Sequence, residues 1–325
     1  MSRSFLVSAR VDWGYVRVVR NAVVLAYLAV MAAFLNAQSA QAQVSVVDDL
    51  GARITLAQPA KRVISLAPHI TEMLFAVGAG KAVVGVVDYS DFPPEAKRIV
   101  NVGSSARLDV ERIVSLRPDL IVVWPGGTPI ATLDKLRQLG FVLFSSEPRH
   151  LEQVASDMER LAELVGTGQE GARAAASFRN SMAALAAQYS QRPIITLFYQ
   201  IWDRPITTVA GEQLLNEVFT LCGGRNAFGQ IKNVAPQLDV EAVLAANPQV
   251  IATAGAPEHS AAWIKDWRRW TQLQAVQNGN VVAVDADLTQ RQGPRLAQGA
   301  AQLCETLERA RQTSSAKPKA PKARD

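Results

Sequence analysis

The sequence predicts an α/β protein made of two similar lobes, on three observations. Residues 108–121 and 238–251 repeat one pattern: a capping aspartate, a glutamate in the first helical turn, apolar residues at helical spacing, a proline and an apolar strand. Short, continuous apolar strands alternate with helices around both copies, which favours parallel sheets covered on both faces. A long alanine-rich helix is predicted between the copies and would join the lobes.

The two ends of the chain differ from its body. Residues 1–42 contain four arginines, an apolar run from Ala22 to Leu35 and the segment Ala40-Gln41-Ala42, which is the layout of a secretory signal peptide. The apolar run is shorter than the roughly 20 residues of a membrane-spanning helix, and an uncleaved anchor is the alternative. Residues 313–325 are typical of a disordered basic tail.

The net charge does not imply nucleic acid as a partner. Residues 1–42 and residues 313–325 each carry a net charge of +3, so the total of +5 leaves about −1 for residues 43–312. A near-neutral body lacks the basic surface that nucleic-acid binding requires.

Residues 43–166 are predicted to form the first lobe. A short hairpin over 44–59 turns at Asp49-Leu50-Gly51, and a helix is expected around 70–77. Strands are expected at residues 62–66, 83–87, 120–123 and 142–144.

Residues 167–191 are predicted to form the connecting segment, with one helix over 169–190, and residues 192–312 the second lobe. The strands of this lobe are expected at 194–199, 250–253 and 281–284, and its helices at 212–221 and 296–311. A segment between them carries three tryptophans, Trp263, Trp267 and Trp270.

The only two cysteines of the chain are Cys222 and Cys304. An even count in a secreted chain favours a disulfide, which would stabilise the second lobe by up to roughly 4 kcal/mol by restricting the unfolded chain. Two buried thiols are the alternative.

The sequence argues against an enzyme. It has no Gly-x-Ser-x-Gly elbow, no P-loop, no dinucleotide-binding glycine motif and no visible pair of nucleophile and base. His69, His150 and His259 lack metal-ligand spacing. We therefore expect no catalytic residue and no metal site, with His69 facing a cleft and the other two histidines on surface loops.

Aromatic and charged residues follow several predicted strands. Ligands of open α/β sheets bind beyond the carboxyl ends of the strands, and flat rings with Asp and Arg among them suit a large, flat ligand with polar edges. Trp124 could instead be a core residue, and Tyr89 and Trp202 could be ordinary surface-loop aromatics. Arg204 or Arg291 could belong to a structural ion pair. The candidate ligand-binding residues are Tyr89, Trp124, Phe198, Tyr199, Trp202, Arg204, Asp287 and Arg291.

The chain resembles the iron-siderophore and vitamin B12 family of periplasmic binding proteins of ABC importers, and in particular the B12 branch of that family. The resemblance covers about residues 60–310. It rests on Arg62–Pro68 with Thr71-Glu72, on Tyr89–Pro94, on Leu108–Leu120 followed by Trp124-x-Gly126-Gly127, on Tyr199–Pro205, and on Leu221-Cys222-Gly223-Gly224-x-Asn226-x-Phe228.

The resemblance implies a class III-type architecture, in which two Rossmann-like lobes are joined by a single long helix, close little, and hold the ligand between them. It implies a Cys222–Cys304 bridge, and corrinoid contacts at Tyr89, Trp124, Tyr199 or Phe198, Asp287 and Arg291. The implied function is capture of cobalamin or a related corrinoid by a periplasmic monomer for a dimeric ABC permease at the inner membrane, with no resident cofactor. The family's docking glutamates map onto Glu111 and Glu241.

The sequence departs from the best-known B12 binder at two positions. Ser105 and Ala235 stand where that protein brings tryptophan to the ligand, and Trp202 could compensate from another loop. An iron-siderophore or haem binder on the same scaffold is the alternative, with Tyr89 or His69 as the iron ligand. A secreted α/β oxidoreductase or metal enzyme is the alternative of a different class.

Overall fold

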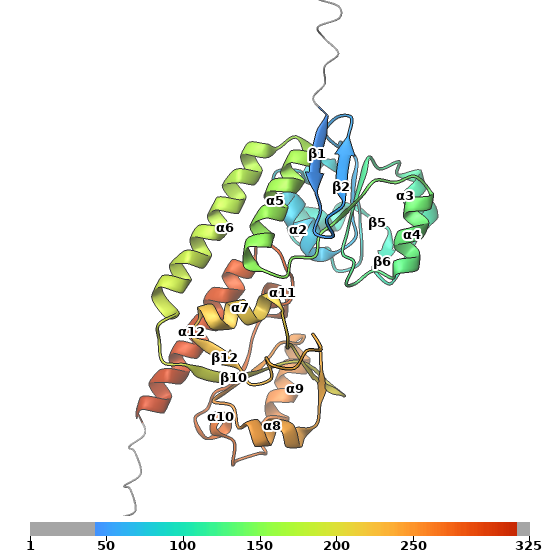
Figure 1. The fold of residues 1–325 in the computed structure, drawn as a ribbon. Coiled ribbons are helices and arrows are strands. Elements are labelled where there is room, and N and C mark those ends of the chain that lie inside the picture. Colours follow the sequence, from blue (N-terminus) through green and yellow to red (C-terminus); the bar gives the residue numbers. More distant parts are fainter. Residues whose placement is uncertain (1–42, 317–325) are drawn as a thin grey trace, which may run out of the picture. The chain divides into compact units, whose positions relative to one another are not determined.

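The computed structural model describes residues 43–316. It confirms an α/β fold of two lobes, in each of which the central strands of the sheet are parallel (Figure 1). The predicted signal peptide and residues 317–325 of the predicted tail lie outside the described residues. The predicted boundaries of the lobes remain predictions.

Among the described residues, the sheet of the first lobe has five parallel strands in the order β5-β4-β3-β8-β9. Strand β8 reads Leu-Ile-Val-Val and is buried throughout, because helices cover both faces. The strands are β3 (Val63–Ser65), β4 (Val83–Val86), β5 (Val100–Asn101), β8 (Leu120–Val123) and β9 (Leu143–Ser145). The helices are α2 (Pro68–Ala76), α3 (Val110–Ser115), α4 (Ile130–Gln138) and α5 (Leu151–Val165), with 3₁₀ turns at Gly80–Ala82 and Pro94–Arg98.

Two short antiparallel hairpins accompany this sheet. The first is the predicted N-terminal hairpin, formed by β1 (Val44–Val47) and β2 (Arg53–Leu56). The second pairs β6 (Gly103–Ser104) with β7 (Arg107–Leu108).

The sheet of the second lobe is mixed. In the part of the chain that is described, its order is β13-β11-β10-β14-β15, and β12 pairs with β10 as well. The pairs of β10 with β12 and β14, and of β14 with β15, are parallel, whereas β11 pairs antiparallel with β10 and β13. The strands are β10 (Ile195–Asp203), β11 (Ile206–Thr208), β12 (Gly224–Asn226), β13 (Gln237–Leu238), β14 (Val250–Thr253) and β15 (Val281–Ala283). The helices are α7 (Leu214–Leu221), α8 (Val240–Ala246), α9 (Pro257–Trp267), α10 (Gln274–Gln277), α11 (Ala286–Thr289) and α12 (Leu296–Ala316).

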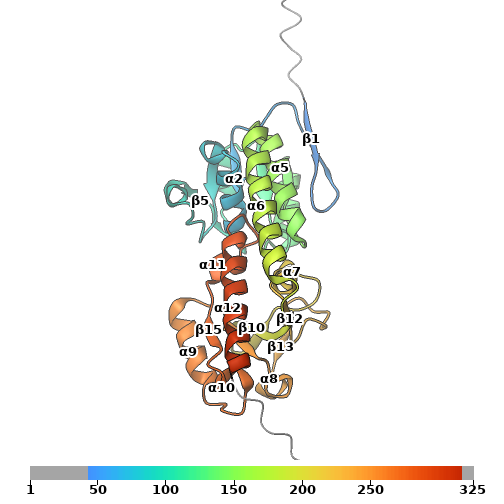
Figure 2. The same cartoon turned by 90° about the vertical axis from the view of Figure 1, so that its left-hand side faces the viewer.

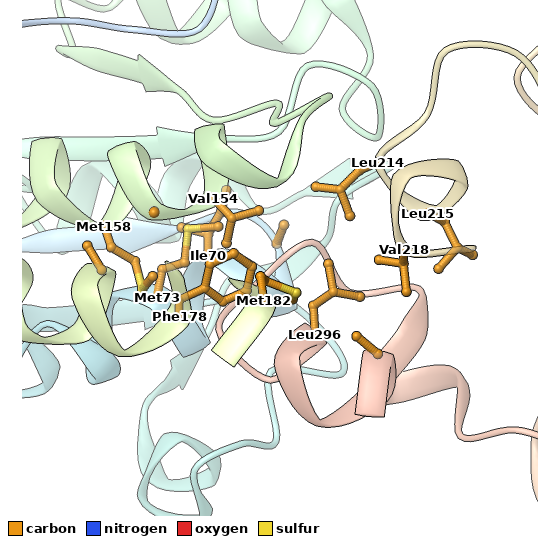
Figure 3. Close-up of a cluster of buried hydrophobic side chains, with 14 of the residues drawn as sticks. Ile70, Met73, Val154, Met158, Phe178, Met182, Leu214, Leu215, Val218 and Leu296 are labelled. Carbon is orange, nitrogen blue, oxygen red and sulfur yellow. The ribbon is translucent and has the colours of Figure 1, made fainter. Parts of the chain in front are cut away.

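The long connecting helix is α6 (Gly168–Tyr189), one residue from its predicted start and end. It packs against α12 (Figure 2). A continuous apolar core runs along these helices from α2 and α5 of the first lobe to α7 and α12 of the second. Figure 3 shows part of it, including Met73, Phe178, Met182, Val218 and Leu296. The lobes are therefore joined by buried apolar packing as well as by the chain.

The two copies of the sequence repeat form matching structures. Asp109 and Asp239 cap α3 and α8, because each carboxylate accepts a hydrogen bond from the backbone N–H three residues later, at 2.9 and 2.7 Å. The residues before the two prolines, Arg117 and Asn247, both adopt left-handed backbone conformations, with φ of 44° and 41°. The predicted duplication therefore extends to the backbone turn that ends each helix.

Two sequence expectations about elements were wrong. The second-lobe strand was expected to end at residue 199, but β10 continues to Asp203 because it pairs with β11 in an antiparallel hairpin. The tail was expected to begin at residue 313, but α12 continues to Ala316, and the Thr313 hydroxyl contacts Asn280 of the second lobe. The tryptophan segment, for which no element was predicted, forms helix α9 up to Trp267.

Candidate functional site

Candidate residues gather where the carboxyl ends of β3, β4 and β8 face the segment after β15. His69 follows β3, Asp91 follows β4 and Trp124 follows β8. The His69 and Trp124 rings meet edge to face with centroids 5.6 Å apart. Arg291 of the second lobe donates a 2.9 Å hydrogen bond to Asp91. The structure therefore brings these strand ends of the first lobe together with the second lobe.

Trp124 is half-buried because the glycines after it make room for its ring. A Cβ atom on Gly127 would lie 2.1 Å from Trp124 Cε3, so no other residue fits there without displacing the indole. The Trp124 ring also packs against the main apolar core. Part of the alternative core role of Trp124 is therefore present, and its ligand role stays a prediction.

His69 was expected to face a cleft, but its side chain is buried. Its side chain is 5 % exposed, and Nε2 has no hydrogen-bond partner among the described residues. Burial, and then the nearby Arg291 charge, lower the pKa of His69 to about 3. The imidazole is therefore neutral at physiological pH.

Tyr89 is the most exposed of the candidate aromatic residues, at 81 %. Its φ of 64° is rare for a residue with a bulky side chain. The next residue is anchored, because the Ser90 hydroxyl lies 3.1 Å from the buried hydroxyl of Thr71. The chain thus holds a large ring out of the surface, and such backbone outliers are common at ligand sites.

Arg291 is the centre of an ion-pair network. Its Nη1 atom donates to Glu72 Oε1 and Asp91 Oδ1, each at 2.9 Å, and its Nη2 atom lies 2.9 Å from Asp287 Oδ1. Arg295, four residues later and just before α12, donates to both oxygens of Glu72 at 2.9 and 2.6 Å. The side chain of Glu72 is 1 % exposed, whereas that of Asp287 is 54 % exposed.

The contacts in the network shift the pKa values of Arg291 and Asp91 toward their charged forms. Burial lowers the pKa of Arg291, but its hydrogen bonds to Glu72 and Asp91 and the charges of Asp287 and Glu72 together raise it above the usual value. Burial raises the pKa of Asp91, but the hydrogen bond and the charge of Arg291, with smaller contributions from a backbone hydrogen bond and Lys97, together lower it below the usual value. The predicted structural ion pair of Arg291 is therefore present, and Asp287 offers an exposed carboxylate beside it.

Phe198 and Tyr199 are not on a surface, which corrects their place in the predicted ligand set. They are consecutive residues within β10, so their side chains point to opposite faces of the sheet, and both faces are covered. Phe198 packs against Trp267 and Phe228, and Tyr199 packs against Phe219 and donates a 2.7 Å hydrogen bond to Thr289. Both are 0 % exposed.

Trp202 and Arg204 lie farther along the same hairpin. Trp202 is 53 % exposed, and its ring meets the edge of His259, which stacks on Trp263. Arg204 is 86 % exposed and pairs with its neighbour Asp203 at 3.3 Å. No contact within residues 43–316 ties either residue to the network around Arg291.

Glu72 and Arg295 belong to this region but were not among the candidate ligand-binding residues, and Glu72 was named only as part of the motif Thr71-Glu72. One signal was available, because helix α2 reads Pro-His-Ile-Thr-Glu-Met-Leu-Phe-Ala and Glu72 is its only acidic residue. A lone carboxylate in an apolar helix requires a buried partner. Its partner lies more than 200 positions away, so the sequence does not reveal it.

The other predicted residues lie elsewhere. Glu111 and Glu241 are exposed in the first turns of α3 and α8. Ser105 is half-buried and Ala235 exposed. Cys222 and Cys304 form the predicted disulfide between the end of α7 and helix α12.

No group of three or more His, Cys, Asp or Glu side chains in residues 43–316 is arranged to hold a metal ion. No helix of that part of the chain is both long and apolar enough to cross a membrane.

Comparisons with known proteins agree with the fold. The family model for periplasmic binding proteins matches residues 63–288. A vitamin B12-binding protein of Vibrio cholerae is 41 % identical over 251 residues, which cover 77 % of this chain and 90 % of the relative. One from Yersinia pestis is 38 % identical over 255 residues, or 77 % of this chain and 88 % of the relative.

Solved structures extend the comparison. The periplasmic vitamin B12-binding protein BtuF of Vibrio cholerae aligns with a TM-score of 0.73 and 41 % identity, over 78 % of this chain and 98 % of that one. The periplasmic haem-binding protein RhuT of Roseiflexus sp. RS-1 aligns with a TM-score of 0.69 and 26 % identity, over 77 % and 99 % of the two chains. These relatives are binding proteins. The chain therefore belongs to the periplasmic binding protein family, and its similarity to vitamin B12-binding proteins extends over most of its length.

Proposed function

We propose that this chain is a periplasmic substrate-binding protein that captures cobalamin or a related corrinoid between its lobes and delivers it to an ABC permease. The observation that supports this most is the 41 % identity with vitamin B12-binding proteins, together with the strand-end cluster around Trp124 and Arg291. No bond is made or broken in this function. The corrinoid is cargo and not a cofactor.

The chemistry of the cluster suits such a cargo. A corrinoid is a large, flat ring system with amide side chains at its edge. Tyr89, Trp124 and Trp202 offer ring surface, and the exposed carboxylate of Asp287 can accept hydrogen bonds from amides. Arg204 is exposed enough to add a further donor at the edge. Phe198 and Tyr199 would support strand β10 from within and not touch the ligand.

Calorimetric titration with cyanocobalamin and cobinamide tests the ligand. We expect saturable binding with a dissociation constant well below about 10 µM. A dissociation constant of that size would be weak for so large a ligand. Tyr89→Ala and Trp202→Ala should each weaken binding by roughly tenfold or more if stacking contributes about 1–2 kcal/mol. Ile194→Ala is a matched control, since Ile194 is 64 % exposed but lies just before the amino end of β10, at the other end of that strand from Trp202. An absence of saturable binding would refute the proposal.

Haem or an iron siderophore is the second candidate ligand. Tyr89 favours it, because an exposed phenol on a protruding turn is available as an iron ligand. His69 does not, because its Nε2 atom is buried. Absorption spectra recorded after mixing with hemin or a ferric siderophore distinguish this case, since iron coordination by a phenolate produces a new charge-transfer band that Tyr89→Phe removes.

We further propose that Glu111 and Glu241 dock the protein on the permease. Each carboxylate is exposed at the start of one of the two repeated helices, so each lobe presents one to a permease of two identical subunits. Reversing both charges to arginine should leave corrinoid affinity intact and abolish uptake in reconstituted vesicles. The matched control reverses Glu258, an exposed first-turn glutamate of α9, and should transport normally.

The predicted signal peptide and segment boundaries complete the proposal. Cleavage near residue 42 would release a monomer with lobes at 43–166 and 192–312, linked through residues 167–191. Mass spectrometry of the protein recovered from the periplasm gives the mature N-terminus. An intact N-terminus in the membrane fraction would favour the uncleaved anchor.

A further inference from the structure

Glu72 is a buried carboxylate shared by two arginines of the other lobe. Arg295 forms a bidentate pair with Glu72, in which Nε donates to Oε2 at 2.9 Å and Nη2 donates to Oε1 at 2.6 Å. Arg291 adds a third hydrogen bond, from Nη1 to Oε1 at 2.9 Å. A charge that is 1 % exposed persists only where opposite charges and hydrogen bonds replace water. The pair therefore holds one particular placement of the second lobe against the first.

The two arginines are not equivalent. Arg295 directs its bonds to Glu72 alone and lies over the Phe92 ring at 4.1 Å from its centroid. Arg291 divides its bonds among Glu72, Asp91 and Asp287. Arg291 can therefore exchange a partner for a ligand group without leaving Glu72 unpaired, because the bidentate bond from Arg295 remains.

We infer that Glu72 and Arg295 are positioning residues: they form a fixed ion pair between the lobes that holds Arg291 and Asp287 opposite the aromatic strand ends of the first lobe. Glu72 does not touch the ligand, since it is covered on all sides. Arg291 is the exchangeable member. This inference rests on the proposed function for its link to corrinoid binding, but the lobe placement it describes exists without ligand.

Two variants test the pair. Glu72→Gln keeps the shape of the side chain and removes its charge. Arg295→Lys keeps the positive charge and removes the bidentate hydrogen bond. Asp134→Asn is the matched control, because it breaks an exposed ion pair with Arg137 in the first lobe. Spin labels on Gln138→Cys and Gln272→Cys, both exposed and one in each lobe, report the distance between the lobes without ligand.

We expect both variants to broaden the distribution of inter-lobe distances and to weaken cyanocobalamin binding, Glu72→Gln by at least about tenfold and Arg295→Lys by less. The control should match the wild type in both measurements. If Glu72→Gln does not fold, Arg295→Lys provides the same comparison.

Unchanged distances and affinity in the folded variants would overturn the inference. Weaker binding at unchanged lobe distances would also overturn it, because Glu72 would then act on the ligand directly. If the wild type does not bind cyanocobalamin, the proposed function fails, while the ligand-free distances still decide whether Glu72 and Arg295 hold the lobes.

Discussion

Replacing His69 with leucine should make the protein more resistant to acid. His69 is neutral in the folded protein because burial and the Arg291 charge lower its pKa to about 3. In the unfolded chain a histidine titrates near its ordinary value of about 6.5. The unfolded state therefore binds a proton between these two pH values and the folded state does not.

The sign and size of the effect follow from this difference. A group with a depressed pKa in the folded state stabilises the fold above its unfolded pKa, and that stability is lost as the pH falls toward the folded pKa. Each pH unit in the window costs about 1.4 kcal/mol, so the wild type should lose about 3 kcal/mol through His69 between pH 7 and pH 4. His69→Leu removes the titrating group and, with it, the unpartnered Nε2 atom.

Urea denaturation at pH 7, 6, 5 and 4 measures the difference. The free energy of unfolding of wild type relative to His69→Leu should fall steadily across the series. His259→Gln is the matched control, since His259 is exposed, and its curve should run parallel to that of the wild type. If the free energies of unfolding of wild type and His69→Leu change with pH in parallel, the inference that His69 is buried and neutral is wrong. Carboxylates that pair in the fold, such as Asp91, titrate in all three proteins and cancel in the comparison.

Three further predictions concern stability. Replacing Cys222 and Cys304 with alanine opens a loop of 82 residues and should lower the free energy of unfolding by about 4 kcal/mol, measured by urea denaturation against the oxidised wild type; a loss below about 1 kcal/mol would contradict the chain-entropy argument. Burial, and then the Asp49 charge, raise the pKa of Asp157 to about 8, although the Arg160 charge opposes them. The protonated Asp157 carboxyl therefore stabilises the fold fully below pH 4, and this stabilisation is lost as the pH rises through 8. Asp157→Asn should therefore become more stable relative to wild type from pH 5 to pH 8.5 in thermal melts, and a constant difference would argue against a protonated Asp157. Tyr199→Phe removes the buried hydrogen bond to Thr289 and should cost about 1–2 kcal/mol in the same urea assay, whereas no cost would mean that the bond contributes nothing net.

The sequence alone predicted those features that depend on near neighbours. The caps at Asp109 and Asp239 are bonds across three residues, and the repeat that contains them identified the two lobes. Continuous apolar strands predicted parallel sheets, and alanine content predicted helix α6 to within one residue at each end. In the same way, Trp124 and Tyr89 were placed at strand ends because a strand is recognised from consecutive residues.

The tertiary structure alone decided which of these residues are buried and which charges meet. Phe198 and Tyr199 were expected at the end of a strand, where a ligand could reach them. In the structure β10 pairs with β14 at both residues and continues past them to Asp203, and both side chains are buried. Glu72 finds Arg295 more than 200 positions away. The physical reason is one of range: a cap or a helical period is specified by bonds between neighbours in the chain. The burial of a ring or the partner of a charge depends on surfaces that exist only after both lobes have packed.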